Sequence, residues 1–303
     1  MTNKTNNSAF HVIPASSMNK KVNPPGYYSN KPFQQKITVI IGGSQGMGFA
    51  TAKKIATLGG SLCLVARRNK ELQKAAEEIH SLQNLPQQFI AFISCDATNM
   101  EELKPRLEAF INQYGTPDYL INAAGYAYPQ YIKKLTIDDF RQNMDVNYYS
   151  QLVPILILLP FFIKYKKGHI VNITSVLGFM GMMGYATYTP TKYAIVGLSE
   201  TLRNELKPHS IRVSVVFPPD TETEGFKHEN QNKPPETKYM SKSTKRMSPD
   251  DVAKILVKGI LKKKFYIFPG DSRFIYHVNR IFPWFIRFYM DQSLKKAKKS
   301  LKK

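Results

Sequence analysis

Tyr188 and Lys192 are spaced as Y-x-x-x-K, a pattern that can serve proton transfer. Four residues make about one helical turn, so both side chains would project from one face of a helix. A phenol with a pKa near ~10 exchanges protons poorly at neutral pH unless a cation stabilises its phenolate, and Lys192 offers that cation. The spacing alone is weak, because Tyr27 and Lys31 repeat it in a polar segment.

Two polar residues upstream strengthen the interpretation of Tyr188 as a general acid/base. Ser175 directly follows an apolar run, and its hydroxyl could hydrogen-bond a substrate carbonyl. Asn147 lies in the run DVNYYS and would complete a polar relay to solvent through Lys192, the alternative being an Asn that merely bonds helix backbone. These side chains together suit proton transfer to or from the oxygen of a ketone or an alcohol.

A glycine-rich run, IGGSQGMG, follows the apolar segment ITVII. Glycines spaced G-x-x-x-G-x-G allow a tight turn, let a pyrophosphate approach the backbone, and begin a helix whose first amides attract phosphate. Such a pattern is weak alone but indicates a dinucleotide site when it lies between a strand and an amphipathic helix. The cofactor contacts predicted in this turn are Gly42, Ser44, Gln45, Gly46, Met47 and Gly48.

The end of the second apolar run favours one nicotinamide cofactor over the other. An NAD enzyme would have a carboxylate there for the ribose diol, but this sequence has Ala66, Arg67 and Arg68. A guanidinium can fork onto a 2′-phosphate, so we expect NADPH/NADP+, the alternative being a solvated basic loop. After the third run, Asp96 could accept from the adenine amine or cap the next helix, and Ala97 completes this group of expected contacts.

The elements that must position these residues are short apolar runs separated by helical segments. Runs that are nearly continuous in apolar character and too short for helices are typical of strands in a parallel sheet covered on both faces. We therefore predict a single α/β domain with a Rossmann-type, doubly wound parallel sheet of about seven strands. The predicted strands are 37–41, 61–66, 88–94, 118–122, 169–174, 212–217 and 265–268.

Three segments organise the chain around this sheet. Residues 1–36 are polar and expected to be flexible, residues 37–270 form the NADP(H)-binding catalytic domain, and residues 271–303 form an aromatic and basic extension. Within the domain, 218–247 is rich in Pro, Thr, Glu, Lys and Asn, as in long loops that act as lids or bind substrate. The apolar stretch 151–163 is short and contains two prolines, which favours a core helix over a membrane span.

Composition and charge exclude several classes of protein. Both cysteines, Cys63 and Cys95, fall in apolar runs, so a disulfide framework is not expected, nor is a metal site. The net charge of +21 resides mainly at the ends: residues 1–36 carry five Lys and no acid, and residues 261–303 carry twelve Lys/Arg and two Asp. Without base-stacking or zinc motifs, such tails indicate solvated or membrane-facing segments rather than nucleic-acid binding.

These motifs, in this order, resemble the signature of the classical short-chain dehydrogenase/reductase family over about residues 37–268. The resemblance implies that Tyr188 is the acid/base, that Lys192 binds the nicotinamide ribose and lowers the pKa of Tyr188, that Ser175 orients substrate, and that Asn147 supports a water relay. Further cofactor contacts implied by the motifs NAAG and F-P-P-D-T-E-T are Asn122, Ala123, Pro218 and Thr223. Ile41, Ala123 and Pro219 depart from the family pattern, but none removes a catalytic atom.

The segments 217–238 and 248–260 resemble the branch of this family that reduces the long-chain-base ketone 3-dehydrosphinganine to sphinganine with NADPH. This resemblance implies a long-chain base as substrate and a role in sphingolipid biosynthesis. The alternatives are another lipid-like ketone or alcohol, such as a steroid, retinoid or fatty-acyl compound, and a non-enzymatic NADP(H)-binding membrane scaffold.

The C-terminal extension suits a lipid surface. Arg273, Arg280 and Arg287 recur every seven residues among aromatic side chains, and Pro283 would kink the helix that carries them. With the tail SLKKAKKSLKK, this predicts an element lying in the headgroup region of an anionic membrane, while packing on a second subunit or over the active site is the alternative. We expect the catalytic domain on the cytoplasmic side, at the endoplasmic reticulum in a eukaryote or the inner membrane in a bacterium, as a possible homodimer or homotetramer.

Overall fold

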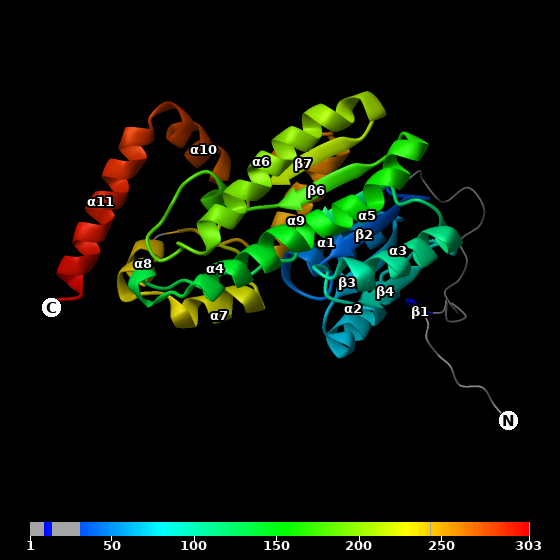
Figure 1. The fold of residues 1–303 in the computed structure, drawn as a ribbon, viewed down its shortest axis with the longest axis horizontal. Helices are drawn as coiled ribbons and strands as arrows, with labels where there is room; N and C mark the ends of the chain where they lie inside the picture. The colour runs from blue at the N-terminus through cyan, green and yellow to red at the C-terminus, as the bar shows by residue number, and fades with distance from the viewer. Residues whose placement is uncertain (1–8, 14–30, 243, 303) are drawn as a thin grey trace.

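The computed structural model describes residues 9–13, 31–242 and 244–302 and contains one eight-stranded sheet (Figure 1). Each of the seven predicted runs forms a strand. The strands are β1 (His11–Ile13), β2 (Ile37–Ile41), β3 (Ser61–Ala66), β4 (Ile90–Ser94), β5 (Tyr119–Asn122), β6 (His169–Ile173), β7 (Arg212–Val216) and β8 (Tyr266–Ile267).

The strand order β1-β4-β3-β2-β5-β6-β7-β8 confirms the predicted doubly wound sheet. All neighbouring pairs from β4 to β8 are parallel, so their carboxyl ends meet at one edge. The order reverses where β2 pairs with β3 on one side and with β5 on the other, Ile41 lying opposite both Val65 and Asn122. Open α/β sheets bind ligands in the crevice outside the carboxyl ends at such a reversal.

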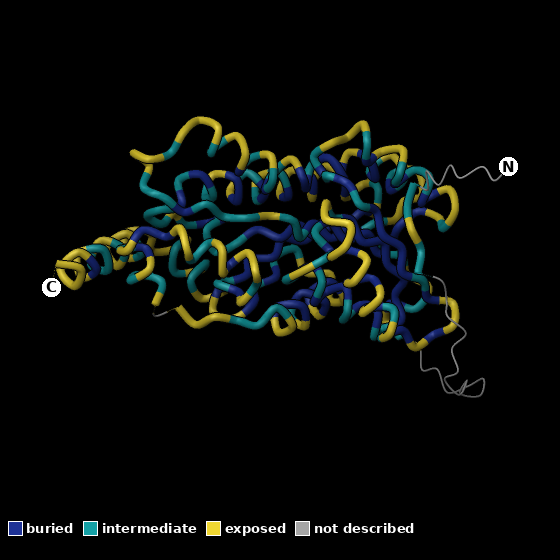
Figure 2. Tube along the Cα trace, turned by 90° about the horizontal axis from the view of Figure 1, so that it is seen from below, coloured by how far each residue is buried: buried dark blue, intermediate teal, exposed yellow. Residues whose placement is uncertain are grey.

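Helices cover both faces of the sheet, which explains why its strands are apolar throughout. Side chains of α1, α2 and α9 pack on one face, and those of α3, α5 and α6 pack on the other. Figure 2 shows the buried residues concentrated between these layers. The six helices are α1 (Gly46–Thr57), α2 (Asn69–Ser81), α3 (Met100–Tyr114), α5 (Ser150–Tyr165), α6 (Tyr188–Leu206) and α9 (Pro249–Leu261).

Strand β1 was not expected from the sequence. Residues 1–36 are predicted above to be polar and flexible, yet His11–Ile13 pair antiparallel with β4 and the Phe33 side chain is fully buried. Three residues give no readable alternation, and the pairing depends on an open sheet edge about 80 residues further along the chain. The rest of the predicted flexible segment, residues 1–8 and 14–30, lies outside the described residues.

The apolar stretch 151–163 lies in α5, and Leu158 and Phe162 are fully buried in the core, as expected for a core helix. It continues without interruption from α4 (Ile137–Met144) through the π-helical turn η2 (Asp145–Tyr149). The combined helix Ile137–Tyr165 is long and apolar enough to cross a membrane by length and composition alone, but half of its most apolar window is buried inside the protein.

The predicted loop 218–247 contains two short helices, α7 (Glu224–Asn232) and α8 (Pro235–Ser241). The extension forms α10 (Ser272–Ile281) and α11 (Pro283–Ser300), with α11 packed beside α8 at the end of the molecule farthest from β1 (Figure 1). Pro283 begins a new helix rather than kinking one, because its ring suits the first helical turn. The expected seven-residue Arg stripe is thereby divided, with Arg287 on a different helix from Arg273 and Arg280.

Candidate active site

Tyr188 and Lys192 begin α6, which places them one turn apart on the same helix. The Lys192 ammonium lies 5.3 Å from the centroid of the Tyr188 ring, and its Nζ donates a hydrogen bond to the Ile173 carbonyl at 3.3 Å. Burial lowers the pKa of Lys192 from 10.5 to about 8. A cation is therefore available beside the phenol at neutral pH, although burial makes it easier to discharge.

Burial also raises the pKa of Tyr188, and the negative charges of Glu229 and Asp220 raise it further, whereas a hydrogen bond with Ser175 acts in the opposite direction. The resemblance implies a lowered pKa, but in this structure burial has the larger effect. A phenol with a raised pKa stays protonated at neutral pH, which suits a proton donor in ketone reduction better than a base in alcohol oxidation.

Ser175 and Asn147 approach the same place from different elements. Ser175 caps the short 3-10 helix η3 (Val176–Gly178) at the end of β6, where its Oγ accepts from the Leu177 amide at 3.2 Å. Asn147 lies in η2, and π-helical turns often occur at functional sites. Its side chain is fully buried and pairs with the backbone of Tyr126, accepting from the amide and donating to the carbonyl, both at 2.9 Å.

Gly125 explains how Asn147 and Lys192 come together. A Cβ at Gly125 would lie 2.8 Å from Asn147 Oδ1 and 3.2 Å from Lys192 Nζ, so both side chains close around a backbone that can carry no side chain. Asn147 thus fixes the loop after β5 as well as lying next to the predicted relay. The alternative considered for this residue was a bond to helix backbone, whereas its hydrogen bonds go to the loop residue Tyr126.

The glycine turn fits a dinucleotide. A Cβ at Gly42 would lie 2.7 Å from the Ala124 amide nitrogen, and one at Gly48 would lie 2.2 Å from the Gly42 carbonyl oxygen, so the backbone packs where only glycine is possible. Gln45 precedes α1 and makes no side-chain capping bond, and the first turn of α1 carries no acidic residue. The first amides of α1 are thereby left for an anion, as pyrophosphate binding requires.

Arg67 and Arg68 lie beside this turn, at the carboxyl end of β3. Arg68 donates a hydrogen bond to Gln45 Oε1 at 2.6 Å and pairs with Glu71 at 3.3 Å, while Arg67 lies 3.9 Å from Asp96. Asp96 accepts from the backbone and hydroxyl of Thr98, so it stabilises a turn, and Asn99 rather than Asp96 caps α3. Ser44, Gly46 and the buried Ala97 lie at the same edge of the sheet.

Asn122, a predicted cofactor contact, turns its side chain into the sheet. Its side chain is fully buried within the sheet, where its Nδ2 donates to Asn172 Oδ1 on β6 at 2.8 Å. The following residue, Ala123, does line the cavity, as do Met47, Pro218 and Thr223. Thr223 also caps α7 by accepting from the Phe226 amide at 3.1 Å, and its methyl group packs against the position of Gly46.

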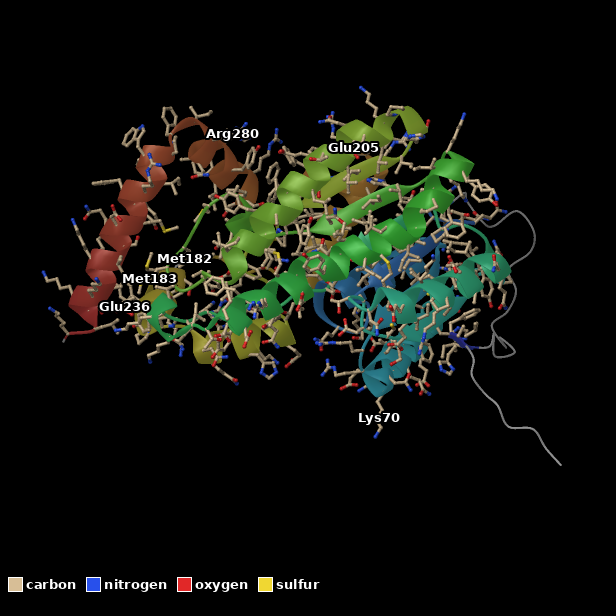
Figure 3. All side chains as sticks on the ribbon, in the orientation of Figure 1. Lys70, Met182, Met183, Glu205, Glu236 and Arg280 are labelled. Atoms are coloured by element: carbon tan, nitrogen blue, oxygen red, sulfur yellow. The ribbon has the colours of Figure 1, made fainter. Side chains whose placement is uncertain are left out.

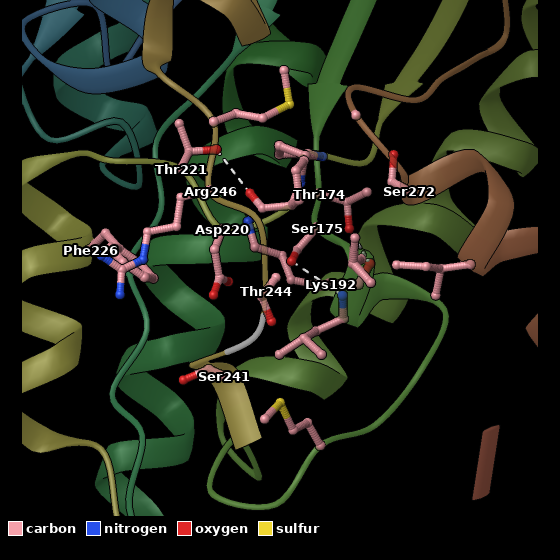
Figure 4. Close-up of a pocket in the computed structure, with 18 of the residues that line it drawn as sticks. Thr174, Ser175, Lys192, Asp220, Thr221, Phe226, Ser241, Thr244, Arg246 and Ser272 are labelled. Atoms are coloured by element: carbon pink, nitrogen blue, oxygen red, sulfur yellow. Dashed lines mark hydrogen bonds between the residues drawn. The ribbon is translucent and has the colours of Figure 1, made fainter. Parts of the chain in front are cut away.

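One cavity of about 950 Å³ connects these residues to the C-terminal helices (Figure 4). Ser175, Tyr188 and Lys192 lie along its inner part. The neighbouring lining residues are Met47, Ala123, Pro218 and Thr223. Residues of the C-terminal extension form the outer wall of the cavity. From the sequence, this arrangement was expected only as the alternative in which the extension packs over the active site. The contributing apolar side chains are Phe274, Ile275, Val278, Phe285, Ile286, Tyr289 and Met290.

Comparison with known proteins agrees with this geometry. A family model described as short chain dehydrogenase matches residues 36–234. The chain belongs to the short-chain dehydrogenase family. It is an oxidoreductase that uses a nicotinamide cofactor, which confirms the enzyme class expected from its motifs.

Curated relatives of this short-chain dehydrogenase match most of its length. A 3-ketodihydrosphingosine reductase from Dictyostelium discoideum is 36% identical over 246 residues, covering 77% of this chain and 74% of the relative. A 3-dehydrosphinganine reductase from Danio rerio is 34% identical over 228 residues, covering 75% and 69%. By name, both relatives belong to the branch of the family that the segments 217–238 and 248–260 were predicted to resemble.

Solved structures share the fold at lower identity. Levodione reductase superposes with a TM-score of 0.72 at 19% identity, over 80% of this chain and 98% of that one. A short chain dehydrogenase from Mycobacterium paratuberculosis bound to NAD gives a TM-score of 0.70 at 21% identity, over 80% and 99%. Each superposition covers 80% of this chain but nearly all of the other one, so this chain has segments beyond the domain that it shares with these structures.

Charged residues in the cavity of this dehydrogenase were missed by the sequence analysis. Glu229 of α7 accepts a hydrogen bond from the Tyr185 hydroxyl at 2.6 Å and pairs with the buried Lys233 at 2.9 Å. Asp220 follows β7 and projects into the middle of the cavity (Figure 4). The only sequence signal was the acid in F-P-P-D-T-E-T, which is uninformative until the fold places it beside Tyr188.

Proposed function

We propose that this enzyme reduces 3-dehydrosphinganine, a long-chain-base ketone, to sphinganine with NADPH as hydride donor. The observation that carries the proposal is the cavity, which begins at Tyr188 and continues along the apolar wall of α10 and α11. A polar inner end and an apolar outer wall suit a substrate with a polar head and a hydrocarbon chain. The names of the curated relatives point to the same substrate.

The side chains divide the reaction between them. Bound NADPH would supply the hydride, with its two electrons, to the carbonyl carbon. Tyr188 gives its phenolic proton to the carbonyl oxygen, which becomes the hydroxyl of the product, while the Ser175 hydroxyl holds that oxygen in place. Lys192 stabilises the phenolate left behind, and the proton is restored from solvent past Asn147.

The preference for NADPH is supported by the two guanidinium groups at the end of β3. Arg68 could reach an anion at the edge of the glycine turn, because it already bonds Gln45 within it, and Arg67 precedes it at the end of β3. We expect Arg67→Ala and Arg68→Ala to weaken NADPH binding at least about tenfold, the typical loss for a charge-assisted contact, while NADH binding changes little. Fluorescence titration of both reduced cofactors measures this; equal loss for both would contradict the assignment.

The extension is proposed to hold the enzyme on the cytoplasmic surface of a membrane. Its exposed aromatic and aliphatic side chains alternate with Arg and Lys, as in helices that lie in the headgroup region of anionic bilayers. A hydrocarbon chain could then lie along the apolar side chains of α10 and α11 while the polar head of the substrate reaches the inner end of the cavity at Tyr188. The exposed apolar residues are Phe274, Ile281, Phe282, Trp284, Phe285, Phe288, Tyr289 and Leu301.

The test is turnover. Purified full-length protein with NADPH and detergent-dispersed 3-dehydrosphinganine should consume NADPH and form sphinganine, identified by mass spectrometry. Tyr188→Phe should lose at least about 100-fold in kcat, the usual contribution of a positioned general acid, with NADPH affinity retained. The matched control Tyr193→Phe changes an exposed tyrosine of the same helix and should leave kcat unaltered. Absence of product with the wild-type protein would refute the proposal.

A further inference from the structure

Asp220 is a half-buried carboxylate that lines the catalytic cavity. Among residues 9–13, 31–242 and 244–302, no side chain donates a hydrogen bond to its carboxylate and no cation lies within ion-pair distance of it. Burial raises its pKa, because a carboxylate removed from water without a bound cation is disfavoured in its charged form. A positively charged ligand would supply what this group lacks.

The sheet places Asp220 next to the reacting residues. Strands β6 and β7 pair in register with Ile173 opposite Val216, so the segments that follow them leave the sheet side by side. The Val176 amide, next to Ser175, donates to the Pro218 carbonyl at 3.2 Å. Asp220 and Tyr188 line the same cavity, and the charge of Asp220 contributes to the raised pKa of Tyr188.

The backbone of Asp220 is held by hydrogen bonds that join the two ends of the segment 218–247. The Met247 amide donates to the Asp220 carbonyl at 3.0 Å, and the Glu222 amide donates to the Met247 carbonyl at 3.0 Å. These bonds join the start of the segment 218–247 to its end, where Thr221 and Met247 also form an isolated β-bridge. A carboxylate on such a support can select a ligand with little loss of conformational entropy.

The other charged groups of the inner cavity already have contacts. Glu229 is paired with Lys233 and accepts from Tyr185. The Arg246 guanidinium lies over the Phe226 ring, 5.4 Å from its centroid, although its charge and that of Lys233 still lower the pKa of Asp220 from a distance. In Figure 4, the Asp220 carboxylate points into the cavity between Arg246 on one side and Ser175 on the other. Asp220 is the acid left for a ligand.

We propose that Asp220 binds the ammonium group of an α-amino ketone and so selects long-chain bases over ketones that lack the amine. This inference rests on the proposed function. In such a substrate the ammonium is carried by the carbon next to the carbonyl, so a carbonyl held by Tyr188 and Ser175 brings the ammonium towards the segment after β7. Asp220 acts here as a specificity residue, not as a participant in proton or hydride transfer.

The test compares two ketones of equal chain length, one with the amino group next to the carbonyl and one with hydrogen in its place. The full chain, Asp220→Asn and the control Asp271→Asn are assayed with NADPH. Asp271 also lines the cavity but is exposed just before α10, so its change removes the same charge from a position open to solvent. We expect Asp220→Asn to lower kcat/KM for the amino ketone about 10- to 100-fold, the effect of losing one charge-assisted hydrogen bond, and to change the other ketone about twofold at most.

Calorimetric binding of sphinganine to the NADP+ complex gives a readout independent of turnover, with weaker binding expected only for Asp220→Asn. An unchanged preference between the ketones in Asp220→Asn, an equal loss for both, or equal sphinganine binding by all three proteins would overturn the role of Asp220. Absence of turnover by the wild-type protein would instead overturn the proposed function. NADPH titration confirms that each variant retains its cofactor site.

Discussion

Replacing Lys192 by Met should make the protein more stable while removing its activity. Lys192 is almost completely buried, and burial lowers its pKa from 10.5 to about 8. At pH 7 the folded protein therefore holds the Lys192 ammonium in a buried place, where the charge is less favourable than it is in water. Methionine has a similar length and shape without the charge, so it removes the penalty along with the cation that stabilises the phenolate of Tyr188.

The size of the effect follows from the two pKa values. The unfolded chain binds more protons than the folded one between pH 8 and 10.5, so the stability of the wild-type protein rises with pH across that window. The penalty is about 3 kcal/mol at pH 7 and about 1 kcal/mol at pH 9.5, because one pKa unit is worth about 1.4 kcal/mol. Loss of the bond to the Ile173 carbonyl costs about 1 kcal/mol at both pH values and is limited by Gln151, which also donates to that oxygen.

Urea unfolding followed by far-ultraviolet circular dichroism, without cofactor, measures the difference. We expect Lys192→Met to exceed the wild type by about 2 kcal/mol at pH 7 and to lose about 2 kcal/mol of that advantage by pH 9.5. Lys70→Met is the control, because Lys70 extends from α2 into solvent (Figure 3). A variant that is less stable than the wild type at pH 7, or whose advantage is the same at both pH values, would refute the reasoning.

Three further predictions concern the turn, the core and the extension. Gly48→Ala should lose about 1–3 kcal/mol of stability and most of the NADPH affinity, because the added Cβ would meet the Gly42 carbonyl oxygen. The control Gly197→Ala, on an open face of α6, should not destabilise the protein. Chemical unfolding and cofactor titration of the two variants measure the difference. Burial lowers the pKa of His169 from 6.5 to about 4, so stability should fall by about 3 kcal/mol as pH drops from 6.5 to 4, and His169→Gln should flatten this slope in unfolding curves. Trp284, the sole tryptophan of the chain, should show blue-shifted fluorescence with phosphatidylserine vesicles but not with phosphatidylcholine vesicles; no shift with either would count against membrane docking.

The sequence by itself determined the sheet and much of the candidate catalytic set. Strands buried on both faces must be apolar along their whole length, so runs such as ITVII could be recognised without knowing their neighbours. The spacing of Tyr188 and Lys192 is local, because one helical turn joins them, and the glycine turn is local as well. Helix ends in the loop after β7 were less visible, since short helices with polar faces lack a strong periodic signal.

Tertiary structure alone decided which distant residues meet. The neutralisation of Glu229 by Lys233, the isolation of Asp220, and the turning of Asn122 into the sheet depend on strand register and on contacts between separate elements. Strand β1 required an open edge on β4, and the cavity wall required α11 to pack beside α8 and α10 to pack beside η3. The acid/base pair could be recognised from chain-local geometry, whereas what surrounds Tyr188, and therefore its pKa and its substrate, arises only when segments far apart in sequence exclude water from one place.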